Sequence, residues 1–148
     1  RMALDSPAAV RQLALLDIVP TLEVWEAMTA RSALASHHWL FLAAPAPVPD
    51  NLINAEPETY IGHLLDQWAG SQAAFDARDK RAYIDQYRKE SVVAASCADY
   101  RAGATLDWAH DAVDRDQGNR IKCPTLVLWG KDYLGKMKES PAQVWDRW

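Results

Sequence analysis

The sequence predicts an α/β fold in which two parallel strands flank a long helical insertion. Two short apolar, β-prone segments lie near the ends of the 148-residue chain. Between them, roughly a hundred residues show helical periodicity and no strand signal. Parallel strands need a crossover connection, and a long helical one commonly covers the carboxyl edge of the sheet, where ligands bind. We therefore expect the insertion to be a cap domain.

Two apolar segments predict the strands. The first covers residues 13–19, between a helix end that residues 6–7 break and Pro20, which stops the run. A continuous apolar run of this length is typical of a strand buried on both faces of a parallel sheet. The second covers residues 125–129, which are apolar and β-prone and follow a turn at Gly118. We expect both segments to be parallel strands of the core.

Helical periodicity fills the insertion between the strands. Ile61, Leu64, Leu65 and Trp68 fall at i, i+3, i+4 and i+7, which is one face of a helix. Pro57 lies where the first turn of that helix tolerates proline. Further helices are expected over residues 22–37, 79–90 and 91–111.

The domain organisation follows from this order of elements. Residues 1–20 and 118–148 are expected to belong to the core, and residues 21–117 to form a helical cap domain. Within the cap, residues 43–49 carry prolines at alternate positions. This stretch is expected to be an extended loop, because proline cannot continue a helix.

Composition and charge exclude several classes of partner. The net charge of −4 and the scattering of the 16 basic residues leave no stripe that would follow a phosphate backbone. No apolar run reaches the roughly 18 residues that cross a bilayer, and the first residues lack the layout of a signal peptide. We therefore expect a cytoplasmic protein that acts on a small molecule, without a nucleic-acid or membrane partner.

No metal or cofactor is expected. Cys97 and Cys123 are widely separated and have no His or Cys at ligand spacing, so we interpret them as small buried hydrophobic residues. His63 carries no motif, and His110 with Asp111 is expected at the surface. A zinc site would need three or four convergent ligands, which this spacing does not offer.

Two aspartates follow the predicted strands. Asp17 comes directly after the first strand and immediately precedes the insertion. It is either a turn carboxylate or helix cap, or the acid that orients a catalytic histidine on a loop after a strand end. Asp132 follows the second strand and is a rival for the acid role, although a solvated turn explains it more simply.

Several short motifs are spread over the whole chain. They are Asp17-Ile18-Val19-Pro20-Thr21, His38-Trp39, residues 45–52, Trp68, residues 99–104, Leu128-Trp129-Gly130 and Val144-Trp145. Taken together, these motifs resemble the fluoroacetate dehalogenases, the haloacetate dehalogenase branch of the α/β-hydrolases. The resemblance covers essentially the whole chain and implies an α/β-hydrolase fold.

The resemblance also implies a reaction and site residues. In that family an aspartate displaces halide from the α-carbon of a haloacetate, and water activated by a histidine hydrolyses the resulting ester. Asp17 then corresponds to the acid that holds the histidine. His38, Trp39 and Tyr100 correspond to a halide cage of N–H and O–H donors, and Trp68 to an apolar pocket wall. Without the family pattern, ordinary packing of the cap would explain these aromatic residues.

The chain lacks the other parts of such a catalyst. It has no Gly-x-Asp-x-Gly or Gly-x-Ser-x-Gly elbow, and the histidine and carboxylate-binding arginines are expected outside it. We therefore expect an inactive internal piece of a longer enzyme that binds a haloacid and releases halide, with a homodimer as one option for that parent. An epoxide hydrolase, a haloalkane dehalogenase and a non-catalytic helical binding module are the alternatives.

Overall fold

The computed structural model describes residues 1–70 and 76–148. The chain divides into two compact units. The first, here called the strand unit, comprises Arg1–Thr29 and Gly103–Trp148, and the second, the helical unit, comprises Ala30–Ala102. These packing boundaries lie inside the expected cap of residues 21–117. Compact packing and the division into core and cap are different properties, so the cap assignment stays a prediction.

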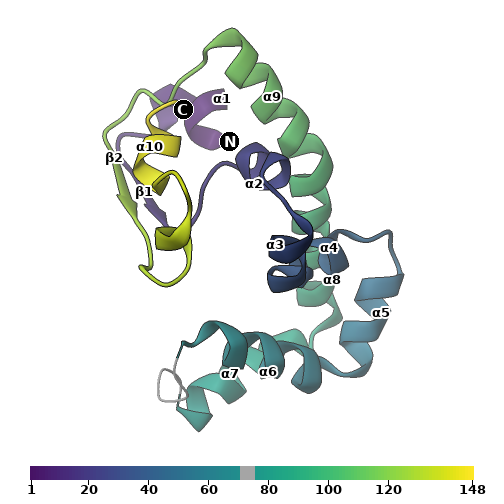
Figure 1. Ribbon diagram of the computed structural model, residues 1–148. Coiled ribbons are helices and arrows are strands. Elements are labelled where there is room, and N and C mark those ends of the chain that lie inside the picture. The colour runs from purple at the N-terminus through teal and green to yellow at the C-terminus, as the bar shows by residue number, and fades with distance from the viewer. Residues whose placement is uncertain (71–75) are drawn as a thin grey trace. The chain divides into compact units, whose positions relative to one another are not determined.

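The strand unit contains the two expected parallel strands. Strand β1, Leu13–Leu16, pairs in parallel with β2, Thr125–Leu128, and the two strands lie side by side in Figure 1. The register runs from Leu13 opposite Thr125 to Leu16 opposite Leu128. The prediction of two parallel strands joined by a long helical connection is therefore confirmed.

The expected burial of the strands on both faces is not found. Strand β1 alternates between partly buried and exposed residues, and Leu16 is 64% exposed. On β2, Leu126 and Leu128 are exposed as well. Among residues 1–70 and 76–148 the sheet has only these two strands, so each strand leaves one edge and much of its apolar surface uncovered.

Four helices complete the strand unit. They are α1 (Met2–Asp5), α2 (Thr21–Glu26), α9 (Trp108–Gln117) and α10 (Pro141–Trp145), with 3₁₀ turns at Pro7–Ala9 and Leu134–Lys136. Helix α2 packs on α9, and the core of this unit is formed by Val19, Leu134 and Val144. Gly118 ends α9 in the left-handed conformation at φ 68°, which confirms the predicted turn.

The helical unit contains six helices among its described residues. They are α3 (Ala30–Ala35), α4 (His37–Ala43), α5 (Val48–Ala55), α6 (Pro57–Trp68), α7 (Ala77–Tyr87) and α8 (Glu90–Ala102). Helix α8 packs against α4 and α5, and α6 packs against α7 (Figure 1). Leu42, Ile53, Val93 and Cys97 form one buried cluster, and Ile61, Leu64 and Ile84 of α6 and α7 are buried as well.

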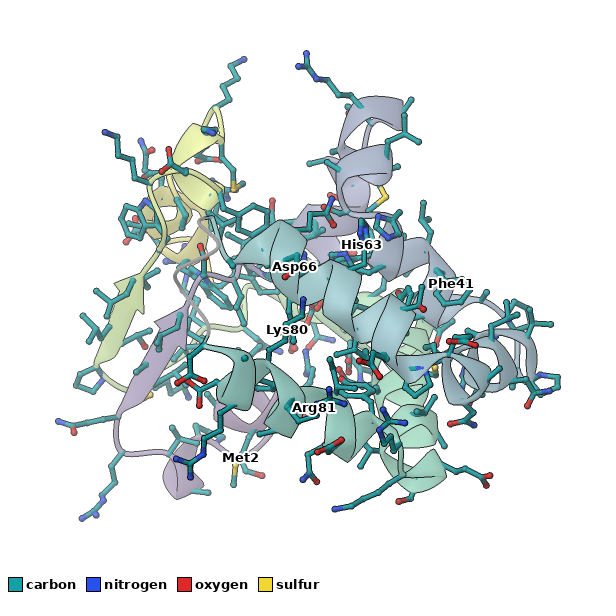
Figure 2. All side chains as sticks on the ribbon, turned by 90° about the horizontal axis from the view of Figure 1, so that it is seen from below. Met2, Phe41, His63, Asp66, Lys80 and Arg81 are labelled. Carbon is teal, nitrogen blue, oxygen red and sulfur yellow. The ribbon has the colours of Figure 1, made fainter. Side chains whose placement is uncertain are left out.

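Ion pairs reinforce the packing of α6 and α7. Lys80 of α7 donates to both carboxylate oxygens of Asp66 in α6, each at 2.7 Å (Figure 2). At the N-terminus of α7, the Asp76 side chain accepts from the Asp79 backbone N–H at 2.7 Å and caps the helix. Helices α6 and α7 therefore form an antiparallel pair that is linked by the ion pair between Lys80 and Asp66.

Three helix boundaries differ from the expected ones. The single helix expected over residues 22–37 is divided between α2, α3 and the first residue of α4. The helix expected over residues 91–111 is interrupted by a π-helical turn, Gly103–Asp107, after which α9 continues to Gln117. The loop expected over residues 43–49 is shorter, because Val48 and Pro49 begin α5. Proline fits there since a first turn needs no backbone N–H.

Asp111 is buried, contrary to the surface position expected for it, whereas His110 is exposed. Arg1 donates to Asp111 at 3.0 Å, and the backbone N–H of Leu22 donates to its other oxygen at 3.3 Å. The Asp111 carboxylate therefore caps the start of α2 from 89 residues away. A cap so distant in sequence leaves no local pattern that could predict it.

Cys97 is buried and Cys123 is only partly buried, and both thiols are free. Burial raises the pKa of the Cys97 thiol, which keeps it protonated. In the part of the chain that the structure describes, no helix is long and apolar enough to span a bilayer.

Candidate functional site

The four aromatic residues predicted to bind halide or line the pocket lie together in the helical unit. The His38 ring centroid is 4.9 Å from that of Trp68 and 5.8 Å from that of Tyr100. The Trp39 centroid is also 5.8 Å from that of Tyr100. All three pairs meet edge to face, an arrangement that aromatic rings favour. We call these four residues the aromatic cluster.

The packing of three helices brings the aromatic cluster together. His38 and Trp39 lie in the first turn of α4, Trp68 is the last residue of α6, and Tyr100 lies near the end of α8. His38 and the core residue Leu42 are four positions apart and so share the face of α4 that packs inward. The contact between α4 and α8 therefore places Tyr100 against both His38 and Trp39.

His38 is the most buried member of the aromatic cluster, with only 7% of its surface exposed. Burial, assisted by repulsion from His37, lowers the pKa of His38 to about 4. The ring is therefore neutral near pH 7 and carries one N–H donor and one acceptor nitrogen. Its Nδ1 atom is buried and has no hydrogen-bond partner among the described residues.

The neighbouring His37 points elsewhere, as expected for adjacent positions on a helix. Its ring centroid lies 6.0 Å from that of His63 and 6.2 Å from that of His38. Of these two adjacent histidines, His38 is the one that pairs with Trp68 and Tyr100. Within residues 1–70 and 76–148, no group of three His, Cys, Asp or Glu residues could hold a metal ion.

Trp68 is 53% exposed, although its ring centroid lies 4.9 Å from that of His38. Its role as an apolar pocket wall stays a prediction. The indole edge still removes part of the His38 ring from water, which contributes to the burial that keeps this histidine neutral.

The ion pair between Arg101 and Asp50, next to the aromatic cluster, was not predicted from the sequence. Arg101, next to Tyr100 on α8, donates to the Asp50 carboxylate on α5 at 3.1 and 3.4 Å and to the Ala44 carbonyl at 3.4 Å. The Arg101 guanidinium holds the pKa of the Asp50 carboxyl below its usual value. Both residues lie inside the family motifs, but a charged pair 51 positions apart gives no local signal of its contact.

Asp17 lies in the strand unit, directly after β1. Its φ angle is +56°, a left-handed conformation that is unusual for a residue other than glycine. Its backbone N–H donates to the Leu128 carbonyl at 2.7 Å, and its Oδ1 accepts from the Gly130 N–H at 3.1 Å. A Cβ at position 130 would lie 3.3 Å from Oδ2, so glycine there lets the carboxylate approach closely.

Asp132, the rival acid, has a different environment. Its side chain is 92% exposed and lies 4.0 Å from Lys136, in a turn that follows β2. An exposed pair at this distance contributes little to orientation, because long side chains in water sample many positions. The solvated turn expected for this residue is therefore what the structure shows.

The parallel strand pair, the acidic residue at the end of β1 and the helical excursion between the strands are features of an α/β-hydrolase fold. Comparisons with solved structures support this class. The chain superposes on a Pseudomonas aeruginosa protein, provisionally described as an epoxide hydrolase, with a TM-score of 0.90 and 35% identity, covering 99% of this chain and 49% of that one. For an α/β-hydrolase from Nostoc sp PCC 7120, also provisionally described, the values are 0.89, 39%, 99% and 50%.

Among curated proteins, the chain is 41% identical over 146 residues to a fluoroacetate dehalogenase from Burkholderia sp. The alignment covers 98% of this chain and 47% of that protein, so the chain spans about half the length of the relatives it matches. No family model matches. Over the part of these relatives that it spans, the chain has the α/β-hydrolase fold, and the resemblance to fluoroacetate dehalogenases indicated by the motifs is confirmed.

Proposed function

We propose that the full-length protein carrying this chain is a haloacetate dehalogenase, for which the chain supplies the halide-binding residues and the acid. The observation that carries the proposal is the aromatic cluster. His38 and Trp39, neighbours in the first turn of α4, each have a ring centroid 5.8 Å from that of Tyr100 on α8, and all three residues carry N–H or O–H donors. They are also the residues that the family resemblance assigns to the halide.

The proposed reaction has two covalent steps. A carboxylate oxygen of an aspartate attacks the α-carbon of the haloacetate, the new C–O bond forms, and halide leaves with the electrons of the broken carbon–halogen bond. Water then attacks the ester carbonyl carbon and gives a proton to a histidine. The C–O bond to glycolate breaks, the glycolate alkoxide takes the proton back from the histidine, and the carboxylic acid left on the enzyme ionises to restore the carboxylate. The nucleophile and this histidine are expected outside the 148 residues.

The aromatic cluster would stabilise the departing halide. Negative charge develops on the halogen during the first step, and donors aimed at that position stabilise the transition state. Fluoride needs this most, because carbon-bound fluorine leaves poorly. His38 suits the role, since it is buried, neutral near pH 7 and has an unpaired ring nitrogen. Donors in a water-poor site interact more strongly with an anion than donors in water.

Asp17 would orient the histidine that activates water. The Gly130 backbone N–H donates to Oδ1 of Asp17. Oδ2 of Asp17 lies close to where a Cβ at position 130 would be. A carboxylate fixed in this way can accept a ring N–H and hold one tautomer of a histidine. In the full-length protein, Asp17→Asn should slow ester hydrolysis while alkylation continues, so the ester accumulates in the mass spectrum. A harmless Asp17→Asn beside a damaging Asp132→Asn would transfer the acid role to Asp132.

An epoxide hydrolase is the second candidate, because a Pseudomonas aeruginosa relative carries that provisional description. Epoxide opening requires an acidic hydroxyl that protonates the ring oxygen, and Tyr100 would supply it. Such a reaction gives no reason for His38 and Trp39 to share the site. A haloalkane dehalogenase, the other enzyme alternative, differs because its substrate has no carboxylate.

One assay separates these candidates. The full-length protein is incubated in parallel with fluoroacetate, chloroacetate, a chloroalkane and a small epoxide, and halide or diol is quantified. We expect halide from both haloacetates and little product from the other two. Turnover of the epoxide alone, or of the chloroalkane alone, would reassign the substrate class, and no turnover of any of the four would favour a binding module.

A further inference from the structure

We propose that Trp145 is a positioning residue for the Asp17 carboxylate, acting through a hydrogen bond to the loop that follows β1. The inference rests on the proposed function, in which Asp17 is the acid of the hydrolytic step. The Trp145 indole N–H donates to the Ile18 carbonyl at 2.8 Å. Ile18 is the residue directly after Asp17, so this bond fixes the backbone next to the acid.

The Asp17 backbone needs such support. Its φ of +56° is disfavoured for a residue with a Cβ, and a conformation of this kind persists only where the surroundings hold it. Two contacts come from the β2 side, namely the Leu128 carbonyl, which accepts the Asp17 N–H, and the Gly130 N–H, which donates to Oδ1. Both act on Asp17 itself. Neither restrains the chain beyond it.

Helix α10 supplies the restraint on the far side of Asp17. Its Val144 packs in one buried cluster with Val19, and the next residue, Trp145, binds the Ile18 carbonyl. Residues 17–19, here called the acid loop, are therefore attached to α10 at two consecutive residues, Val144 and Trp145. The first contact is apolar packing and the second is a hydrogen bond. With the β2 contacts, residues 17–19 are held from both sides of Asp17.

Helix α10 is itself placed firmly enough to act as a support. Ser140 and Gln143 form a reciprocal capping box at its start, and Pro141 occupies the first turn. Beyond its end, Arg147 pairs with Glu23 of α2 at 3.3 Å. A donor on a side chain whose helix is fixed at both ends can specify a carbonyl position, which a mobile donor cannot.

Loss of the Trp145 donor would act on one catalytic step. Trp145→Phe keeps an aromatic ring in place but leaves the Ile18 carbonyl without its donor. The loop can then relax toward an ordinary negative φ at Asp17, which turns the carboxylate away from the Gly130 N–H. The histidine that depends on Asp17 would lose its orientation. The attacking aspartate of the first step does not depend on Asp17 and should be unaffected.

The chain offers a matched control at Trp148. Its indole N–H donates to the Glu23 carboxylate at 3.1 Å, so Trp148→Phe also removes one indole hydrogen bond in the strand unit. Trp148 does not contact the acid loop through this bond. Effects that arise merely from losing an indole donor near α10 will appear in both variants, whereas effects on the acid will appear in Trp145→Phe alone.

The experiment uses the full-length protein and separates the two steps. Halide release in a rapid-quench burst reports alkylation with chloroacetate, glycolate release reports hydrolysis, and mass spectrometry reports the ester. In Trp145→Phe we expect hydrolysis to slow roughly ten- to a hundredfold, the loss produced by misplacing a catalytic group by about 1 Å, with alkylation unchanged and ester accumulating. Trp148→Phe should hydrolyse the ester at the wild-type rate.

The outcomes are distinguishable. Wild-type protein that releases no halide from any haloacetate removes the proposed function, and the role of Trp145 with it. Wild-type turnover combined with parallel losses in both steps of Trp145→Phe, or with no loss in either step, overturns the positioning role alone. Equal slowing of hydrolysis in Trp145→Phe and Trp148→Phe overturns it as well, because the acid loop would then not be the cause.

Discussion

At the scale of single residues, the aromatic cluster combines apolar packing with polar donors. The rings of His38 and Trp39 each meet the ring of Tyr100 edge to face, which is a favourable packing arrangement for aromatic rings. Each of the three side chains also carries an N–H or O–H group. The same geometry suits two functions, which are packing in the core of a helical cap and binding of a halide. Only a substrate-dependent measurement distinguishes the two functions.

Substitution of the donors should therefore affect fluoride more than chloride. His38→Ala, Trp39→Phe and Tyr100→Phe in the full-length protein should each lose about 2 to 4 kcal/mol of transition-state stabilisation with fluoroacetate, by analogy with one oxyanion-hole donor. The loss with chloroacetate should be smaller, because chloride leaves more readily and accepts weaker hydrogen bonds. The ratio of kcat/KM for the two substrates cancels general damage to the fold. Equal losses for both substrates in all three variants would indicate packing alone.

The depressed pKa of His38 also predicts how stability depends on pH. The unfolded chain takes up a proton near pH 6.5, whereas the folded chain resists protonation until about pH 4. As pH falls through this window the unfolded state binds more protons, so the free energy of unfolding decreases, by about 3 kcal/mol at most. Above pH 6.5 the contribution does not change.

Urea unfolding of the full-length protein at several pH values between about 7 and 4 measures this effect. Other groups titrate in the same range, so the informative quantity is the difference from His38→Gln, which keeps a polar side chain but cannot titrate. The variant should lose less stability than the wild type as pH falls. Parallel curves for the two proteins would show that His38 is not held neutral.

At the scale of helices and strands, the ion pair between Arg101 and Asp50 connects α8 with α5. The side chains are 27% and 16% exposed, so water screens this pair less than a surface pair. Asp50→Asn removes the charge and one acceptor and should lower the free energy of unfolding by about 1 to 2 kcal/mol. Glu58→Gln disturbs the more exposed pairs with Arg81 and Arg88 and should change stability by less than about 0.5 kcal/mol. Chemical denaturation compares them, and similar effects would contradict a special role for Asp50.

The elements that could be predicted from the sequence are those with local signals. The two apolar runs predicted the parallel strands, and Gly118 predicted the turn that follows α9, because both signals lie within a few residues of the feature. The break between α2 and α3 and the π-helical turn at Gly103–Asp107 carry no comparable signal. Their positions depend on packing against residues distant in the sequence, as the contact between α2 and α9 illustrates.

The same distinction holds for the candidate site. The family motifs selected His38, Trp39, Trp68 and Tyr100, and the structure places these residues together. Hydrogen bonds across 113 and 127 positions, from Gly130 to Asp17 and from Trp145 to Ile18, could not be predicted. A motif reports which residues occur in a family, whereas a supporting contact depends on the fold that brings them together.

At the scale of the whole molecule, the two-stranded sheet dominates the expected behaviour of the 148 residues in isolation. Leu16 and Leu128, paired with one another, and Leu126 on the same strand as Leu128 are all at least half exposed. The relatives are about twice as long as this chain. The free edges of both strands also present unpaired backbone groups, which promote pairing with other chains.

We therefore expect the isolated chain to associate through its strands and to release no halide from haloacetates beyond a protein-free control. Size-exclusion chromatography should show oligomers, and a dye that binds exposed apolar surface should become fluorescent. Leu126→Lys places a charge on β2 and should shift the chain toward the monomer, because charged residues on a strand oppose edge-to-edge pairing. Leu106→Lys is the matched control, since Leu106 is similarly exposed but lies in the π-helical turn. An equal shift with both variants would attribute association to general hydrophobicity, and a monomeric wild-type chain without dye binding would show that the exposed strands do not drive association.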